Sequence, residues 1–393
     1  MKILMISHEY PPIGGGGANA CMSLAKEYSQ KGNEVHIVTV WYEGEKEYEE
    51  LINNNSIFIY RLKSKRKYVD HCSFMEMLDY LRLAYSFSDK LEKKEKFDIC
   101  QIFFGIPSGP IGYHLKNKYK LPYVIRFGGG DIPGFQDRFQ IIYKFISPIV
   151  KYIWKKSDAL VANSEGLKKL AEDFYDKKEI IVIPNGVNIR AFSNESFLSK
   201  TILKKEKEEY IRLLFVSRLI ERKGLQDILP QLRYISERCS QKGLRIQLDV
   251  VGDGPYKADL EKIAKEEEIS DIICFHGQKN KDQLPMYYSN ADIFVFPSRK
   301  EGMPNVVLEA MSYGLPIIMT PCQGSEELIT NNGYITEYQK FGEKILSLCL
   351  NADKRKKMGN NSVKLVEEEF SWSNTSNLYL KIFSEIVSRK KDN

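Results

Sequence analysis

The sequence predicts an α/β protein with two Rossmann-like, doubly wound domains that face each other across a cleft. Apolar, strand-like runs alternate with helix-like stretches through both halves of the chain, which is typical of mostly parallel sheets covered by helices. Residues 188–210 are polar and 204–209 almost all charged, as expected of a connection between domains. Glycines and charged residues follow several predicted strands, at the sheet edge where ligands bind in this fold class.

The composition allows two globular domains and excludes several other classes of protein. The chain has 393 residues, 43% hydrophobic and 28% charged, which is enough for two cores. The formal net charge is +6, but basic and acidic residues are interspersed, so no nucleic-acid partner is expected. The seven cysteines are dispersed and form no Cys-x-x-Cys pair, which argues against a disulfide framework or a zinc site. We find no signal peptide and no apolar run of about 18 residues, which predicts a cytoplasmic protein that does not span a membrane.

The first predicted domain comprises residues 1–190. Strands are expected at residues 2–7, 34–41, 56–60, 98–103, 123–127, 159–162 and 179–183. Helices are expected at residues 18–31, 74–92 and 164–174. The first strand, its helix and the second strand form the start of a β-α-β unit.

Four consecutive glycines, Gly14, Gly15, Gly16 and Gly17, lie between the first predicted strand and its helix. Without a Cβ atom, the backbone there can approach a phosphate closely. As a dinucleotide-binding fingerprint the run is incomplete, because Asn19 stands where the third glycine belongs and no acidic residue clearly ends the second strand. A phosphate-binding turn and an ordinary tight turn both remain open.

A second glycine-rich loop, residues 128–134, follows the strand expected at 123–127. Its Asp131 would face a ligand if the loop lines a binding cleft. The same glycines would also suit the hinge of a lid.

Residues 137–156 combine aromatic and aliphatic side chains with five basic ones. We expect Pro148 to divide the segment into two helices. The pattern predicts a helix pair at the surface of an anionic membrane. Two helices packed on the sheet, with their lysines extending to solvent, are an equally good interpretation.

The second predicted domain comprises residues 208–371. Strands are expected at residues 212–217, 245–251, 272–276, 291–296 and 316–320. Helices are expected at residues 225–241 and 256–267, and a further one from residue 305 onward.

Two carboxylates, Glu301 and Glu309, frame a short loop after the strand expected at 291–296. On one continuous helix they would lie about 80° apart around the axis, so we place Glu301 in the loop and Glu309 one turn into a helix capped by Asn305. Backbone N–H groups at the start of that helix could bind an anion between two hydroxyl-binding carboxylates. The loop residues concerned are Gly302, Met303, Pro304, Asn305 and Val306. A solvated loop before an ordinary helix is the alternative.

Two cations and a glycine follow other strands of the second half. Arg218 and Lys223 come after the strand 212–217, and Gly252 opens the loop after 245–251. An arginine fork and a lysine ammonium suit a diphosphate, although both could simply be surface cations.

The motifs of several enzyme classes are absent. The sequence has no Gly-x-x-x-x-Gly-Lys phosphate loop, no His-Glu-x-x-His and no Gly-x-Ser-x-Gly. We therefore expect neither a metal nor another cofactor. His8, beside the end of the first strand, is the histidine expected near the cleft, in a local hydrogen bond.

Taken together, these residues resemble the retaining family 4 glycosyltransferases of the GT-B fold. The resemblance extends over nearly the whole chain. The similar segments are residues 11–17, 183–187, 217–219, 223–224, 251–255, 289–298, 301–309 and 370–372. In this family a glutamate, seven residues and a second glutamate follow the arginine and the lysine in this order.

The resemblance implies a role for each of the matching residues. Glu309 would bind the ribose hydroxyls of a nucleotide, Glu301 the hydroxyls of the transferred sugar, and Arg218 and Lys223 the diphosphate. Gly15, Gly16 and Gly17 would bind the phosphate side from the first domain, and a terminal helix at 372–393 would return to that domain. Retention would follow from front-face attack, with the departing phosphate accepting the acceptor's proton.

The chain departs from the family pattern at one position. Members usually carry a histidine in the loop after the strand 123–127, near the sugar, and none occurs here. Arg126 and Asp131 are the candidates to replace it.

The resemblance implies a metal-independent transferase that takes a sugar from a nucleotide-sugar. A UDP-sugar such as a UDP-N-acetylhexosamine is favoured, because residues 301–306 resemble those of members that use such donors. The acceptor would be a saccharide or lipid-linked saccharide of bacterial surface polysaccharide synthesis, at the cytoplasmic face of the membrane. The alternatives are a nucleotide-sugar epimerase or hydrolase of the same fold, a nicotinamide-dependent oxidoreductase, and an inactive nucleotide-sugar-binding protein.

Overall fold

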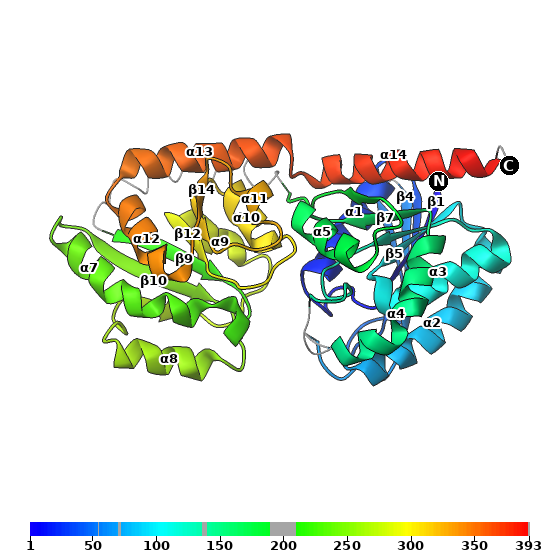
Figure 1. Ribbon diagram of the computed structural model, residues 1–393, viewed down its shortest axis with the longest axis horizontal. Helices are drawn as coiled ribbons and strands as arrows, with labels where there is room; N and C mark the ends of the chain where they lie inside the picture. The colour runs from blue at the N-terminus through cyan, green and yellow to red at the C-terminus, as the bar shows by residue number, and fades with distance from the viewer. Residues whose placement is uncertain (54, 70–71, 136–139, 189–209, 392–393) are drawn as a thin grey trace. The chain divides into compact units, whose positions relative to one another are not determined.

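The computed structural model describes residues 1–53, 55–69, 72–135, 140–188 and 210–391. Contacts divide the chain into two units, the first formed by Met1–Asn185 with Trp372–Asn393 and the second by Gly186–Ser371. Each unit contains one sheet with helices packed against it (Figure 1). The predicted connection at 188–210 lies almost entirely outside the described residues.

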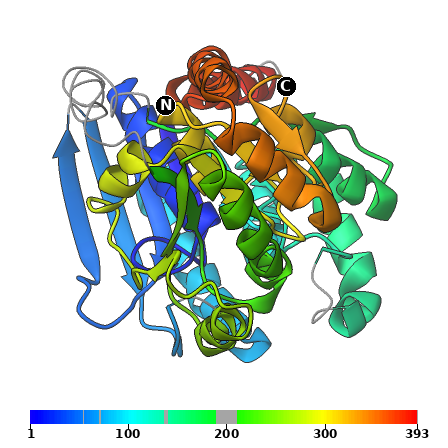
Figure 2. The same cartoon turned by 90° about the vertical axis from the view of Figure 1, so that its left-hand side faces the viewer.

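The first unit has an eight-stranded sheet in the order β3-β4-β2-β1-β5-β6-β7-β8. All neighbouring strands are parallel except β3 and β4, which form an antiparallel edge that Figure 2 shows as two blue arrows. The strands are β1 (Lys2–Ser7), β2 (Glu34–Val40), β3 (Tyr48–Asn53), β4 (Asn55–Leu62), β5 (Ile99–Phe103), β6 (Tyr123–Arg126), β7 (Ala159–Ala162) and β8 (Ile180–Val182).

Helices cover both faces of this sheet. They are α1 (Gly16–Gln30), α2 (Phe74–Glu95), α3 (Gly105–Tyr119), α4 (Gln140–Lys156), α5 (Glu165–Phe174) and α14 (Trp372–Lys391). Successive residues of β1 point to opposite faces, so Ile3 and Met5 pack with α1 and α14, whereas Leu4 and Ile6 pack with α2 to α5. The C-terminal helix α14 thus completes the core of the first unit by packing on α1 (Figure 1).

The second unit has a six-stranded sheet in the order β11-β10-β9-β12-β13-β14, and every pair is parallel. Its strands are β9 (Tyr210–Val216), β10 (Arg245–Val251), β11 (Ile273–Phe275), β12 (Ile293–Phe296), β13 (Ile317–Met319) and β14 (Gly333–Ile335). Its α-helices are α7 (Leu232–Ser240), α8 (Lys257–Glu266), α9 (Leu284–Asn290), α10 (Asn305–Ser312), α11 (Ser325–Leu328), α12 (Phe341–Cys349) and α13 (Ala352–Glu368). The predicted pair of doubly wound sheets is therefore confirmed, each with its own core.

Several local predictions were wrong. The helix expected at 225–241 starts only at Leu232, because short 3-10 turns and Pro230 precede it. Helix α4 is continuous through Pro148. Proline has no N–H to donate to the carbonyl group one turn earlier, but Pro148 lies on the exposed side of the helix, where water can reach that carbonyl. Strands β3 and β14 were not predicted, since β3 is rich in charged residues and β14 has only three residues.

Candidate active site

Lys223 and Glu301 lie in contact at the carboxyl ends of the two central strands of the second unit's sheet. From β9 the chain proceeds outward to β10 and β11 and then returns to place β12 on the other side of β9. The carboxyl ends of β9 and β12 therefore flank the point at which the strand order reverses, where open α/β sheets bind their ligands. Lys223 follows β9 and Glu301 follows β12, and Lys223 Nζ lies 2.6 Å from Glu301 Oε1.

Several donors converge on one oxygen of Glu301. Its Oε1 accepts hydrogen bonds from Lys223 Nζ and from Ser298 Oγ, each at 2.6 Å, and Arg222 Nη1 lies 3.5 Å away. Among the described residues, none donates to Oε2. The carboxylate is thus held by one oxygen while the other can accept a hydrogen bond from a ligand.

The side chains of Lys223 and Glu301 are only 11% and 14% exposed, and burial changes their acidity. Burial lowers the pKa of Lys223, and the attraction of Glu301 offsets this only in part. Burial by itself would raise the pKa of Glu301, but Lys223, Arg222 and the hydrogen bonds to it outweigh burial, so that its pKa is lowered. Glu301 is therefore a carboxylate at neutral pH.

Two glycines bring the surrounding loops into backbone contact. At Gly252, with φ +141°, a Cβ atom would lie 1.8 Å from the carbonyl oxygen of Ser217 after β9. At Gly224, with φ +71°, it would lie 2.0 Å from the carbonyl oxygen of Pro297 after β12. Only glycine allows these contacts, which fix the loop after β9, with Lys223, against the loops after β10 and β12.

Glu309 lies on α10 and is also held by one oxygen. Tyr288 is only 2% exposed, stacks on Tyr313 with ring centroids 5.4 Å apart, and donates its hydroxyl to Glu309 Oε2 at 2.8 Å. In the described part of the chain no donor reaches Oε1. Burial raises the pKa of Glu309, although the bond from Tyr288 opposes the shift.

The expected cap of α10 was wrong. The helix begins at Asn305 itself, and its cap residue is Pro304, in an extended conformation and without a side-chain cap among the described residues. Proline suits the position because it needs no hydrogen-bond partner for a backbone N–H. Gly302, Met303 and Pro304 are buried, whereas Asn305 and Val306 are partly exposed.

Arg218 is exposed at the end of β9.

The first unit places its glycine run where its own strand order reverses, at the carboxyl end of β1 beside β5. Gly15 caps α1 and is exposed, as is Gly16. Gly17 has a packing role, because a Cβ atom there would lie 2.3 Å from the ring of Phe104.

Three other candidates of the first unit, Asp131, Arg126 and His8, are buried. Asp131 is 3% exposed and accepts hydrogen bonds from the N–H groups of Gly105 at 2.6 Å and Gly128 at 2.8 Å. It therefore fixes its loop instead of facing a ligand. Arg126 is 2% exposed and bonds to Asn185.

His8 is buried against Phe104, with ring centroids 4.8 Å apart. In the described part of the chain its Nδ1 has no hydrogen-bond partner, and its Nε2 lies 3.8 Å from Glu9 Oε1, too far for the local hydrogen bond that was expected. Burial lowers the pKa of His8 to about 3, so it is neutral at physiological pH.

Sequence reasoning missed Tyr288, Ser298 and Arg222. Each lies in or beside a segment that the sequence singled out, but none carries a local signal. Their roles depend on contacts with Glu301 and Glu309, which lie across the loop or on another element.

Known protein families match nearly the whole chain. Glycosyltransferase Family 4 matches residues 14–191, and Glycosyl transferases group 1 matches residues 199–365. The chain belongs to the family 4 glycosyltransferases. It is thus an enzyme that transfers a sugar from a nucleotide-sugar.

Individual proteins resemble this glycosyltransferase along most of their length. An uncharacterized glycosyltransferase of Methanocaldococcus jannaschii is 27% identical, over 98% of this chain and 99% of the relative. The alpha-monoglucosyldiacylglycerol synthase of Streptococcus pneumoniae is 24% identical, over 81% of this chain and 70% of the relative. The structure of Anabaena HepE in complex with UDP-glucose matches with a TM-score of 0.70 at 16% identity, covering 99% of this chain and 100% of that one. This likeness shows a GT-B fold.

One group of acidic and histidine side chains in the described part of this glycosyltransferase has the spacing of a metal site. The one candidate metal cluster found there is Glu34, His36 and Glu95, and Lys2 Nζ lies within it, 2.9 Å from Glu34 and 2.8 Å from Glu95. The lysine ammonium thus supplies the positive charge. No helix of the described residues is long and apolar enough to cross a bilayer.

Proposed function

We propose that this glycosyltransferase moves a sugar from a UDP-sugar, with retention and without a metal, to a saccharide or lipid-linked saccharide of bacterial surface polysaccharide synthesis. The observation that carries the proposal is the pair of carboxylates around α10. Glu301 and Glu309 are each held through one oxygen, and each has a second oxygen that can accept hydroxyl groups. A nucleotide-sugar has two sets of hydroxyl groups, one on the ribose and one on the sugar, and the diphosphate separates them.

In this proposal the donor is bound by the second unit. Glu309 Oε1 accepts from the ribose hydroxyls and Glu301 Oε2 from the sugar hydroxyls, while Lys223 and Arg218 face the diphosphate. Lys223 already neutralises Glu301, so the ammonium would turn from the carboxylate toward the phosphate as the donor binds. There it would offset the charge that grows as the sugar–phosphate bond breaks by front-face attack.

Similarities to other glycosyltransferases support UDP and the acceptor class. The Anabaena protein with the same fold was solved with UDP-glucose, and residues 301–306 resemble those of members that use UDP-N-acetylhexosamines. The name of the pneumococcal relative indicates that its product is a glycolipid. We assign the donor to residues 208–371, and the acceptor to residues 1–190 together with the helix 372–393.

We also propose a peripheral contact with anionic membrane at the cytoplasmic face. Helix α4 exposes Phe145 and Ile149 to 80% and 61%, and its lysines Lys144, Lys151 and Lys155 are exposed too. Residues 137–139 of the segment predicted for this role lie outside the described part of the chain.

A screen of sugar nucleotides against saccharide and lipid-linked acceptors, read by release of the nucleotide, tests the proposal. We expect release from one UDP-sugar that depends on an acceptor. Full release without any acceptor would indicate a hydrolase or epimerase instead. Binding of UDP without release from any donor would indicate an inactive binding protein, and tight NADH binding would indicate an oxidoreductase.

A further inference from the structure

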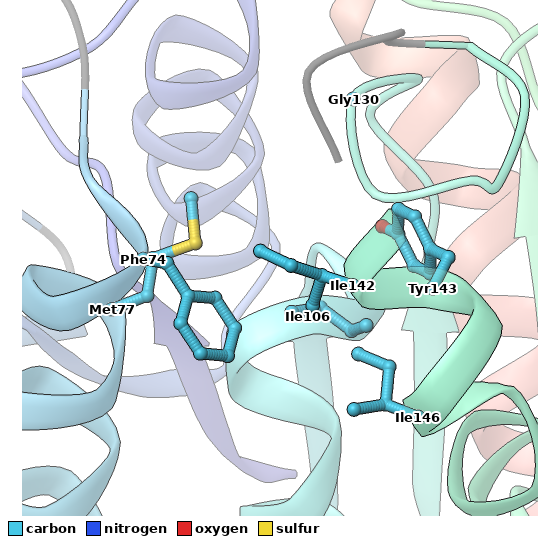
Figure 3. A pocket seen from close by; sticks show the side chains of 7 residues that line it. All are labelled: Phe74, Met77, Ile106, Gly130, Ile142, Tyr143 and Ile146. Atoms are coloured by element: carbon cyan, nitrogen blue, oxygen red, sulfur yellow. The ribbon is translucent and has the colours of Figure 1, made fainter. Parts of the chain in front are cut away.

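An apolar pocket in the first unit is too small for a substrate. Figure 3 shows Phe74 and Met77 of α2 on one side of it, Ile142 and Ile146 of α4 on the other, and Ile106 of α3 between them. Its free space is about 20 Å³, which holds about one water molecule. No sugar or lipid chain fits there, so the charged residues of the second unit are a better guide to substrate binding.

Arg222 is a cation next to Glu301 whose role the proposed function leaves open. It lies in the 3-10 turn Glu221–Lys223, directly before Lys223. Its Nη1 donates to the carbonyl oxygen of Lys300 at 2.8 Å and lies 3.5 Å from Glu301 Oε1. The bond to Lys300 thus holds the guanidinium beside the carboxylate of Glu301.

Two of the groups around Glu301 are charged and two are neutral. Lys223 and Arg222 are the cations that lower the pKa of Glu301 in the described part of the chain. Ser298 donates a neutral hydroxyl to the same carboxylate oxygen. Cys322, in the loop after β13, is close enough to interact with Glu301, but burial raises the pKa of its thiol to about 12, so it is uncharged. Lys223 and Arg222 therefore compensate the buried carboxylate together.

Binding of the donor would remove one of these two cations. In the proposed function, Lys223 turns from Glu301 toward the diphosphate. Glu301, which is only 14% exposed, would then need another counter-charge, because a buried carboxylate without one is unfavourable and takes up a proton instead. A protonated Glu301 would lose the charge that makes it a strong acceptor for the sugar hydroxyls.

We propose that Arg222 is a positioning residue that becomes the counter-charge of Glu301 when Lys223 turns to the diphosphate. The inference rests on the proposed function, because it requires Lys223 to leave Glu301. Arg222 needs little movement, since its Nη1 already lies 3.5 Å from Oε1 and its bond to Lys300 holds it there. Glu301 thus remains a carboxylate in both states, with Lys223 before the donor binds and with Arg222 afterwards.

Calorimetry of UDP binding tests this exchange of cations without measuring transfer. UDP carries the diphosphate but no sugar, so it draws Lys223 away and puts no hydroxyl on Glu301. Titrations near pH 6 in two buffers of different ionisation enthalpy give the number of protons taken up per bound UDP. We expect Arg222→Gln to take up more protons than the wild type, toward one per UDP, because Glu301 then loses both cations. Protonation of UDP itself contributes equally to both measurements.

Two further variants locate the charge and the proton. Arg222→Lys keeps a cation and should take up as few protons as the wild type. The double variant Arg222→Gln with Glu301→Gln has no carboxyl group at this place and should lose the extra uptake. Equal uptake in the wild type and in Arg222→Gln, with UDP bound to both, would overturn the inference and leave the proposed function intact. Absence of UDP binding to the wild type would refute the UDP donor and the inference with it.

The pH dependence of transfer gives a second measurement. The pH profile of kcat reports on the enzyme–substrate complex, and that of kcat/KM on the free enzyme. In Arg222→Gln the acid limb of kcat should move to higher pH, because Glu301 lacks both cations in the complex. The acid limb of kcat/KM should move less, because Lys223 still neutralises Glu301 in the free enzyme. At neutral pH kcat should fall only about fivefold to tenfold, since the side chain of Arg222 is 43% exposed and solvent screens its charge.

Arg299→Gln is the matched control for Arg222→Gln. Arg299 lies in the loop before Glu301 and is 42% exposed, but its carboxylate partners are Asp227 and Glu221. The variant removes a similar charge from the same loops, so it should leave both the proton uptake and the acid limb of kcat in place. An equal shift of the acid limb in Arg299→Gln and Arg222→Gln would show that loosening of the loops is responsible, and would overturn the inference.

Discussion

At the residue scale, the proposed site contains a buried ion pair between Lys223 and Glu301. Lys223 Nζ and Glu301 Oε1 are in contact at 2.6 Å, and both side chains are largely buried. Removal of one partner leaves the other buried without its counter-charge, which is unfavourable. The ion pair thus holds in place the ammonium and the carboxylate that we propose bind the donor's diphosphate and sugar.

The first prediction concerns this pair. Lys223→Ala and Glu301→Ala should each lower kcat by about 10²–10³-fold, the effect of losing one preorganised charge-stabilising contact. Steady-state kinetics by nucleotide release measure the change, with circular dichroism to confirm the fold. Lys262→Ala, an exposed lysine on α8 with an i,i+4 partner, is the control and should retain full activity. Wild-type kcat in either site variant would exclude the assignment.

The second prediction concerns Tyr288 as a positioning residue for Glu309. Tyr288→Phe removes a hydroxyl that donates to Glu309 Oε2 and should raise KM for the donor about fivefold to tenfold, with kcat nearly unchanged. The lost bond also lowers the pKa of Glu309, so in the variant this pKa rises further. Because binding needs the carboxylate, the acid limb of the plot of 1/KM against pH should move to higher pH.

A purely structural role for Tyr288 would leave that acid limb in place and reduce only the amount of folded protein. Tyr234→Phe, a change at an exposed tyrosine of α7, provides the control and should alter neither KM nor the profile.

At the element scale, the site is built from loops that follow different strands and touch through their backbones. The loop after β9 contacts the loops after β10 and β12, through Gly252 and Gly224. Additional backbone bonds join Leu219 N–H to the carbonyl of Asp253 and Arg299 N–H to that of Arg222. A shift of one loop would therefore move the cations and Glu301 together.

The third prediction tests this coupling. Gly252→Ala would place a Cβ atom 1.8 Å from the carbonyl oxygen of Ser217, so the loop must move, and we expect UDP binding by isothermal titration calorimetry to weaken at least about tenfold. Gly243→Ala is a matched control, because it also has a positive φ but no atom within 4 Å of the added Cβ. It should cost about 1 kcal/mol of stability and leave UDP affinity unchanged. Equal losses of affinity would show that backbone strain alone is responsible.

At the scale of the whole molecule, the two units can be followed separately. All three tryptophans, Trp41, Trp154 and Trp372, belong to the first unit, so tryptophan fluorescence reports on that unit alone. The second unit, which holds Lys223, Glu301 and Glu309, can be followed through UDP binding.

The fourth prediction uses this separation for His8. Its pKa is lowered to about 3 in the folded protein by burial, against about 6.5 in the unfolded chain. Above pH 6.5 both states are neutral and the group has no effect; as pH falls toward 3, only the unfolded state binds the proton, so stability is lost. Between pH 7 and 5 the loss from His8 should be about 1–2 kcal/mol.

Urea unfolding followed by tryptophan fluorescence measures this effect. His8→Gln should show a smaller fall in the free energy of unfolding between pH 7 and 5 than the wild type. His114→Gln, which changes a partly buried histidine bonded to Asp89, is the comparison and should leave the pH dependence caused by His8 unchanged. An identical fall in the wild type and in His8→Gln would refute a buried, neutral His8.

The sequence by itself determined the alternation of strands and helices, the two doubly wound sheets, and the order of Lys223, Glu301 and Glu309 along the chain. These features are local, because they depend on hydrophobic periodicity and on residues at fixed spacing. Short or charged strands such as β3 and β14 were not predicted, because they form only through pairing with a neighbouring strand.

Only the tertiary structure decided which side chains meet. It joined Lys223 to Glu301 and Tyr288 to Glu309, turned Asp131 inward to the backbone of its own loop and that of Gly105, and gathered α2, α3 and α4 around an apolar pocket. Residues far apart in the chain become neighbours through the order of strands in a sheet, and burial together with neighbouring charges then sets their protonation. Neither property can be read from the spacing of residues along the chain.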